Sequence, residues 1–140
     1  MKNSIYPCLW FDGQAKAAAE FYCSIFKNSK ITVDTPMVVN FELNGKKFMG
    51  LNGGPNYKFN EAVSFVIDCE TQEEIDYYWN ALVKGGEESM CGWLKDKFGI
   101  SWQIVPTILA SLMTDPARAQ KVMQVVLKSK KFNIDELKNA

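Results

Sequence analysis

Histidine does not occur in this chain of 140 residues. Catalytic systems of the Ser-His-Asp and Cys-His kinds therefore cannot be built from it. A zinc site would have to use cysteines and carboxylates alone, and no spacing in the sequence supports one. The cysteines are Cys8, Cys23, Cys69 and Cys91, none of them in a C-x-x-C pair. We therefore expect no metal ligand set, and reduced thiols of the kind found in the cytoplasm.

The sequence also lacks a net charge and a long apolar run. Its 16 basic and 16 acidic side chains balance, whereas nucleic acids and anionic membranes attract proteins with a basic excess. No segment approaches the roughly 20 apolar residues of a membrane span. The apolar run near the N-terminus is interrupted by Pro7 and Asp12 and is too short for a secretion signal. These absences predict a cytoplasmic protein that binds neither nucleic acid nor membrane.

Apolar residues make up 47% of the chain and charged residues 23%, which are ordinary proportions for a globular protein. A chain of this length is close to the common size of one domain and can bury roughly 70% of its unfolded surface. The composition therefore predicts a single domain that comprises residues 1–140.

The first half of the chain has the pattern of a strand, a helix and further strands. The run IYPCLWF is typical of a strand, and Asp12 is expected to cap the helix that follows. Apolar residues recur at helical spacing from Ala18 to Phe26. Asn44-Gly45 is typical of a hairpin turn. Strands are expected around residues 30–33, 37–43 and 46–51.

The second half repeats this order. The run AVSFVIDC is typical of a strand, and Thr71 with Glu74 forms the S/T-x-x-E capping box of a helix. Further strands are expected around residues 88–94 and 100–105, with the turn DKFG before the last one. Each half is thus predicted to be a β-α-β-β-β unit. The fold class is α+β, with repeat units of about residues 1–54 and 60–106.

After residue 106 the pattern changes to helices, which form a C-terminal extension over residues 107–140. Asp115-Pro116 is expected to start one helix, as N-cap and first-turn proline, and a short helix is expected from Asp135. This tail has more apolar residues than one surface helix needs to bury. It is expected to cover an apolar surface, either on its own sheet or on a partner's.

The repeat predicts which strand faces are apolar. An offset of 57 residues aligns the two helices, and applied to the first strands it places Cys8 and Trp10 under the helix and Leu9 on the other face. In the last strand Trp102 belongs to the core by the same alternation, while Ser101 lies on a wetter face. Carboxylates in turns and at strand edges, such as Glu61 and Asp96, are expected to be solvated.

The wetter face, together with the connection between the two units, supplies the candidate ligand-binding residues. In that connection Gly53 and Gly54 allow a tight turn and Pro55 stiffens its exit. Its polar side chains either contact a ligand or only join the units, and both alternatives remain open. The candidates are Leu9, Met49, Asn52, Asn56, Tyr57, Ser64, Val66, Trp93, Ser101 and Gln103.

Five long strings of the sequence are distinctive: CLWFDGQAKAAAEFY, FELNGKKFMGLNGGP, YKFNEAVSF, CGWLKDKFGISWQIVP and ARAQKVMQVVL. They resemble the PhnB-like family, also called the 3-demethylubiquinone-9 3-methyltransferase domain, of the vicinal oxygen chelate (glyoxalase/bleomycin-resistance) superfamily. The resemblance covers nearly the whole chain and implies the paired β-α-β-β-β fold and a homodimer. Relatives commonly have a histidine in place of Asn56 and a longer glycine-rich connection in place of VDTPM.

The resemblance also implies where a metal would bind. In the superfamily the metal ligands lie on the first and last strands of each unit, and the matching positions here are Pro7, Met49, Ser64 and Gln103. Proline and methionine supply neither a hard oxygen nor an imidazole, and serine and glutamine are weak neutral ligands. We therefore expect no metal and no other cofactor.

Three functions remain open on this basis. The first is a metal-free protein that binds an unidentified small molecule. The second is an enzyme on the same fold, either a methyltransferase as the family name states or a lyase or isomerase that acts through carboxylates. The third is a fold that serves assembly alone. The glycine turn at Gly53 is followed by Pro55 and another strand rather than by a helix, so it does not match a nucleotide-binding turn. No catalytic residue is assigned.

Overall fold

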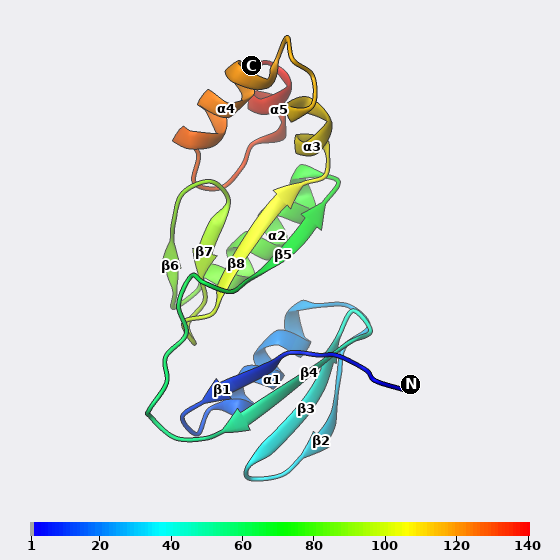
Figure 1. Ribbon diagram of the computed structural model, residues 1–140, viewed down its shortest axis with the longest axis vertical. Coiled ribbons are helices and arrows are strands. Elements are labelled where there is room, and N and C mark those ends of the chain that lie inside the picture. Colours follow the sequence, from blue (N-terminus) through cyan, green and yellow to red (C-terminus); the bar gives the residue numbers. More distant parts are fainter. Residues whose placement is uncertain (1) are drawn as a thin grey trace. The chain divides into compact units, whose positions relative to one another are not determined.

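The structure is a computed structural model that describes residues 2–140. The chain divides into two compact units, Met1–Phe59 and Asn60–Ala140 (Figure 1). Each unit contains one four-stranded mixed sheet and a helix that packs on it. The predicted α+β class and the two β-α-β-β-β repeats are therefore confirmed.

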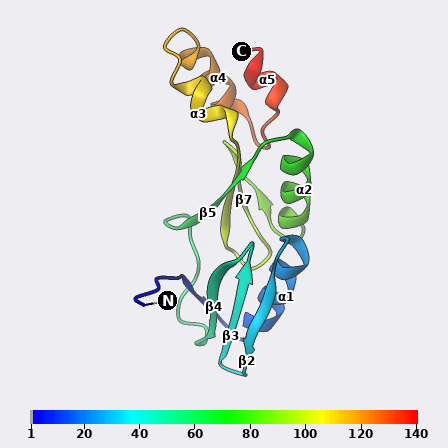
Figure 2. The ribbon, with the colours of Figure 1, turned by 90° about the vertical axis from the view of Figure 1, so that its right-hand side faces the viewer.

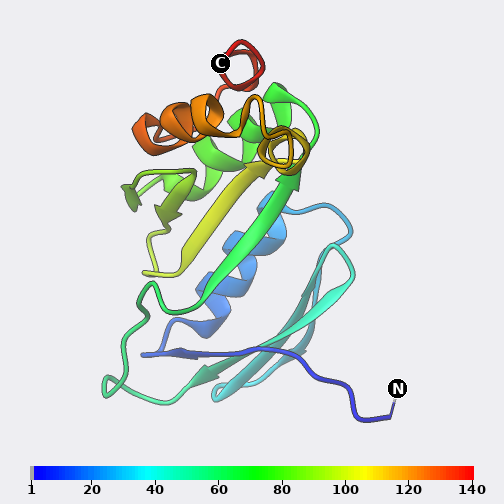
Figure 3. The same ribbon diagram turned by 45° about the horizontal axis from the view of Figure 1, so that its top comes forward.

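The first unit has the strand order β1-β4-β3-β2. β1 runs parallel to β4, and the other neighbours are antiparallel. Figure 3 shows α1 lying across this sheet. The elements are β1 (Cys8–Phe11), α1 (Ala15–Ile25), β2 (Lys30–Asp34), β3 (Val38–Leu43) and β4 (Lys46–Asn52).

Aromatic stacking fills the space between α1 and its sheet. Phe41 of β3 stacks on Phe48 of β4 with ring centroids 5.5 Å apart, and Tyr22 of α1 stacks on Phe41 at 6.2 Å. Tyr22 and Phe41 are almost fully buried. Burial of each such ring stabilises the fold by roughly 1.5–3 kcal/mol, so these contacts fix which face of the sheet α1 covers.

The second unit repeats the architecture with the order β5-β8-β7-β6, in which β5 is parallel to β8. Its helix packs on β7 and β8, where Trp79, Trp102 and Ile104 are buried. The region around residues 88–94 is a hairpin of two short strands. The elements are β5 (Ser64–Cys69), α2 (Gln72–Val83), β6 (Glu87–Glu88), β7 (Trp93–Lys95) and β8 (Ser101–Pro106).

The two sheet helices begin in different ways. At α2 the predicted capping box is confirmed, because the Thr71 hydroxyl accepts a hydrogen bond from the Glu74 backbone and the Glu74 carboxylate accepts one from the Thr71 backbone. At α1 the expected cap by Asp12 is wrong. The backbone N–H of Ala15 donates to Asn52 Oδ1 of β4 at 2.9 Å instead. A residue distant in sequence therefore satisfies this end of α1.

The first strand faces the opposite way from the prediction. Leu9 and Phe11 are buried, at 7% and 2% exposure, whereas Cys8 is exposed. Leu9 pairs with Gly50, and a Cβ at Gly50 would lie 3.2 Å from the Cβ of Ala15 in α1. Leu9 thus belongs to the core beneath α1.

The turn between β1 and α1 explains this difference. Residues 12–14 separate β1 from α1, whereas only residues 70–71 separate β5 from α2. The turn before α1 is therefore one residue longer, and Gly13 within it has a φ of +81°. Because successive side chains in a strand point to opposite faces, one additional residue turns the whole strand over. Cys8 and Trp10 consequently lie on the face away from α1.

The expected solvation of Asp96 is also wrong, because its carboxylate organises the turn before β8. It is 3% exposed. Its Oδ1 accepts from the backbone N–H groups of Phe98 and Ile100, and its Oδ2 accepts from the indole of Trp102 at 2.8 Å. A buried carboxylate needs such donors, and here they hold the DKFG turn and the core tryptophan together.

The tail belongs to the second unit, where Figure 2 shows its helices gathered at one end, and its side chains form a small core of their own. Leu112, Val122, Phe132 and Leu137 are buried in it. The expected helix start at Asp115-Pro116 is wrong by a few residues, since Asp115 Oδ1 accepts from Ala117 in a turn before the helix. The helices are α3 (Ile108–Met113), α4 (Ala119–Lys128) and α5 (Ile134–Lys138).

Hydrogen bonds fasten the segment between α4 and α5 to the rest of the second unit. The backbone N–H groups of Cys91 and Gly92 donate to the carbonyls of Ser129 and Lys130. The side chain of Gln72, at the start of α2, donates to the Phe132 carbonyl at 3.0 Å. The tail therefore covers its own unit.

None of the helices within residues 2–140 combines the length and the apolar character needed to cross a bilayer.

Candidate functional site

One face of the second sheet is polar, and strand pairing defines it. Ser64 of β5 pairs with Ser101 of β8, and Ser101 pairs with Lys95 of β7. One row along, Gln103 pairs with both Val66 and Trp93. Residues paired across strands share a face, so these side chains lie together on the side away from α2. We call this surface the polar face; it comprises Ser64, Val66, Glu87, Trp93, Lys95, Ser101 and Gln103.

Two hydroxyl groups on the polar face differ in their partners. Ser64 Oγ accepts a hydrogen bond from Gln103 Nε2 at 2.9 Å. Ser101 is 1% exposed, and its Oγ has no hydrogen-bond partner among the residues that the structure describes. Buried polar groups are nearly always paired, so the Ser101 hydroxyl is an exception that lacks a partner among the described residues.

A cavity of about 110 Å³ opens beside β6 and β7. This is well above the roughly 10–15 Å³ that one water molecule requires. Within it Lys95 Nζ lies 3.2 Å from Glu61 Oε1. The hydrogen bond from Lys95, a backbone hydrogen bond and the charge of Lys95 lower the pKa of Glu61. The cavity is lined by Glu61, Glu87, Glu88, Ser89, Trp93, Leu94, Lys95 and Ser101.

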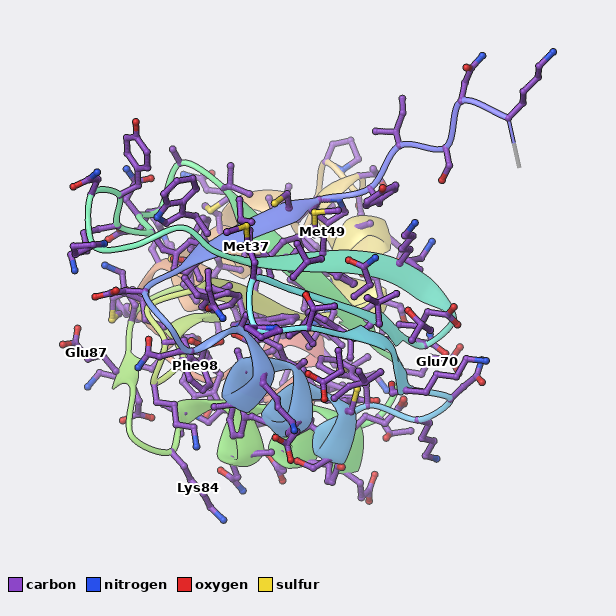
Figure 4. All side chains as sticks on the ribbon, turned by 90° about the horizontal axis from the view of Figure 1, so that it is seen from below. Met37, Met49, Glu70, Lys84, Glu87 and Phe98 are labelled. Carbon is purple, nitrogen blue, oxygen red and sulfur yellow. The ribbon has the colours of Figure 1, made fainter. Side chains whose placement is uncertain are left out.

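Carboxylates are the part of this cavity that the sequence did not indicate. Glu87 is opposite Lys95 in the β6–β7 pair, and Figure 4 shows it at the periphery of the molecule. Glu88 points the other way, since its Oε2 accepts a hydrogen bond from the Trp79 indole of α2 at 3.1 Å. The only sequence signal for this arrangement is the hairpin itself, whose register decides which glutamate shares a face with Lys95.

Three of the ten predicted candidate residues lie in the strands of the first unit's sheet, and they divide between its faces. Met49 is on the face away from α1, where it pairs with Cys8. Leu9 faces α1 and lines no open surface. The side chain of Asn52 makes hydrogen bonds within the first unit, because its Oδ1 accepts from the Ala15 backbone at the start of α1 and its Nδ2 donates to the Pro36 carbonyl at 3.0 Å.

The connection after β4 packs on Trp10, a residue that the predicted register placed under the helix. The indole N–H of Trp10 donates to the Gly54 carbonyl at 2.9 Å, and the Tyr57 ring meets the Trp10 ring edge to face at 4.9 Å. A Cβ at Gly53 would lie 2.2 Å from the Trp10 ring, so glycine is required there. Tyr57 is 65% exposed and Asn56 is exposed. These two candidates thus belong to a loop of the first unit that is braced by Trp10.

The donor set does not fit the metal chemistry of the superfamily. On the first sheet the face away from α1 offers the Cys8 thiol and the Met49 thioether, and desolvation raises the pKa of the Cys8 thiol. On the second sheet Ser64 and Gln103 are neutral. Throughout residues 2–140, no group of three or more His, Cys, Asp or Glu side chains gathers in a way that could hold a metal ion.

Comparison with known proteins places this geometry in a family. The sequence profile of the 3-demethylubiquinone-9 3-methyltransferase family matches residues 3–105. The chain belongs to this PhnB-like family. A PhnB protein from Bacillus cereus that carries the same methyltransferase name is 32% identical over 75% of this chain and 100% of its own, with a TM-score of 0.68. Comparison with curated protein sequences gives no match.

More distant structures share the fold alone. Protein PA1353 from Pseudomonas aeruginosa is 20% identical over 74% of this chain and 96% of its own, with a TM-score of 0.62. The fosfomycin resistance protein FosX from Listeria monocytogenes, solved with Mn(II) and sulfate, is 13% identical over 80% and 96%, with a TM-score of 0.58. The PhnB-like domain is thus a variant of the glyoxalase/bleomycin-resistance fold.

The family match stops within β8, so the helical tail of this PhnB-like protein lies outside it. The string ARAQKVMQVVL, in which the sequence resemblance was expected to continue, falls at residues 117–127 and is therefore not matched. The part of this chain that the family profile matches is the pair of β-α-β-β-β units.

Proposed function

We propose that this chain is a metal-free small-molecule-binding protein of the PhnB-like family, with its ligand on the polar face of the second unit. The observation that carries the proposal is the buried Ser101 hydroxyl, which lines a cavity and has no partner among residues 2–140. A ligand group that pairs with this hydroxyl recovers the free energy that its desolvation costs.

Neighbouring side chains have complementary roles in this proposal. Gln103 can both donate and accept through its amide, and its position beside Ser64 orients that amide. Trp93 provides an apolar surface in the same row. Such a combination of one aromatic wall and a few convergent polar groups is typical of small-molecule sites.

No residue is assigned to catalysis in this proposal, although the family carries a methyltransferase name. Gly53 and Gly54 form the tip of a loop that leads to β5, and the next helix, α2, begins at Gln72. No helix N-terminus therefore follows this glycine pair to meet a phosphate.

The same proposal includes the state of the protein in the cell. We propose a cytoplasmic homodimer of single-domain chains, with neither nucleic acid nor membrane as a partner. The balanced charge supports the absence of anionic partners. Light scattering at micromolar concentration should give twice the chain mass of 15.9 kDa, and a stable dimer should bury more than ~1,000 Å².

A native mass spectrum of the protein purified from its own host, without chelators, tests the proposal. We expect a small-molecule adduct that is released on collisional activation, and no stoichiometric metal by elemental analysis. A spectrum of bare chains only would count against a ligand. One metal ion per chain would restore the metalloenzyme alternative.

A further inference from the structure

The formal charge around the cavity beside β6 and β7 is negative. Three glutamate residues line it, Glu61, Glu87 and Glu88, against the single lysine Lys95. Lys95 is already paired with Glu61, and Glu88 accepts from the Trp79 indole. The Glu87 carboxylate has neither an ion pair nor a hydrogen bond with any described residue, so an unmatched negative charge remains at the cavity rim.

A second observation is independent of this charge. Ser101 lies two strands from Glu87 in the same cross-strand row, since Glu87 pairs with Lys95 and Lys95 pairs with Ser101. Its hydroxyl is buried and unpaired within residues 2–140, and its oxygen can accept a hydrogen bond from an N–H group. Trp93 lines the same cavity and offers a π surface. The free groups are thus two acceptors and an aromatic ring.

We infer that the ligand class of this site is a small organic cation, an alkylammonium or guanidinium compound. Its charged head donates to the Glu87 carboxylate, its carbon chain covers Trp93, and a second N–H group donates to the Ser101 hydroxyl oxygen. Charge-assisted bonds of this kind are about twice as strong as neutral ones, and aromatic rings attract cations. An anion would meet the Glu61 and Glu87 carboxylates and an ammonium group that is already paired. This inference rests on the proposed function and specifies its ligand.

Titration calorimetry of the full chain with putrescine tests the inference. Butane-1,4-diol and succinate, which have carbon chains of the same length, serve as the neutral and anionic comparison probes. We expect putrescine to bind more tightly than either. Glu87→Gln should weaken putrescine binding about tenfold, because a charge-assisted bond becomes neutral. Ser101→Ala should weaken it severalfold, while Glu73→Gln, which changes an exposed glutamate outside the cavity, should leave it unchanged.

The outcomes separate this inference from the proposed function. If succinate or the diol binds at least as tightly as putrescine, the cationic class is wrong and the small-molecule site stands. If none of the three probes binds, the cationic class is again overturned, while the native mass spectrum decides the proposed function by itself. Equal putrescine affinity in Glu87→Gln and wild type would also overturn it. Near-ultraviolet circular dichroism of each variant establishes that the fold is intact.

Discussion

At the scale of single residues, Gln103 is the side chain whose replacement best separates binding from folding. It lies on the polar face, and its amide donates to Ser64. Gln103→Leu keeps the size of the side chain and removes its hydrogen-bonding groups. We expect the compound that co-purifies with the protein to bind about 1–3 kcal/mol more weakly, because a polar ligand group is left unpaired. Calorimetry measures this change, and Gln120→Leu, at an exposed position of α4, is the control.

Asp96 should contribute strongly to stability, although carboxylates in turns are usually solvated and contribute little. Asp96→Ala leaves the buried donors of Phe98, Ile100 and Trp102 without their acceptor. We expect the free energy of unfolding in urea to fall by about 2–4 kcal/mol. Asp68→Ala, at an exposed position of β5, should change it by less than about 0.5 kcal/mol. Equal effects of the two substitutions would show that the Asp96 network contributes little.

Residues such as Asp96 and Asn52 mark the limit of prediction from the sequence at this scale. Carboxylates and amides in turns are usually solvated, and nothing local indicates that Asn52 reaches the start of α1 from β4. The sheet face of Ser101 and Gln103 was predictable, because these polar residues alternate with the apolar Ile100, Trp102 and Ile104. Contacts between residues far apart in the sequence could not be predicted, because local spacing and alternation do not indicate them.

At the scale of elements, the start of α2 is stabilised by a capping box that is recognisable in the sequence. Thr71→Ala removes the hydroxyl that accepts from the Glu74 backbone. We expect a loss of about 1 kcal/mol in the free energy of unfolding. Thr107 is also an N-cap, at α3, but its side chain makes no capping hydrogen bond. Thr107→Ala should therefore be nearly neutral, and a cost as large as that of Thr71→Ala would argue against the capping explanation.

The loop before β7 should tolerate no side chain at Gly92. A Cβ there would lie 2.5 Å from the Phe132 ring and 2.9 Å from the Ile104 carbonyl, and φ is +81°. Gly99 has a similar φ of +90° with nothing nearby. Gly99→Ala therefore costs backbone strain of about 1 kcal/mol, and Gly92→Ala should cost a further 1–3 kcal/mol, roughly, from overpacking. Chemical denaturation of both variants checks this, and equal losses would contradict the packing of the tail on this loop.

Most elements were predictable because their signals are local and periodic. The capping box of α2, the hairpin turn at Asn44-Gly45 and both helix stripes follow directly from residue spacing. The face of β1 was not predictable from the repeat, because a single residue in the turn before α1 reverses it. Gly13 was the available signal, since a glycine in such a turn often takes a positive φ.

At the scale of the whole molecule, the family profile and the internal repeat cover the same part of the chain, residues 3–105. The helical tail lies outside both. The tail completes the second unit by packing Phe132 against Gly92. The apolar residues of the tail indicated that it covers a surface, but which surface it covers depends on loops distant in sequence. The preference for a ligand likewise depends on side chains that strand pairing brings together on the polar face. Their chemistry indicates the class of the ligand.

The most direct test of the central claim is a ¹H–¹⁵N NMR spectrum of the protein with and without the compound that co-purifies from its host. That compound should lie on the polar face of the second unit. Its binding should shift the signals of the Gln103 side-chain amide, the Ser101 backbone amide and the Trp93 indole, and Gln103→Leu identifies the first signal. Shifts confined to the Gly53–Tyr57 loop or to α3–α5, with these three signals unmoved, would contradict it.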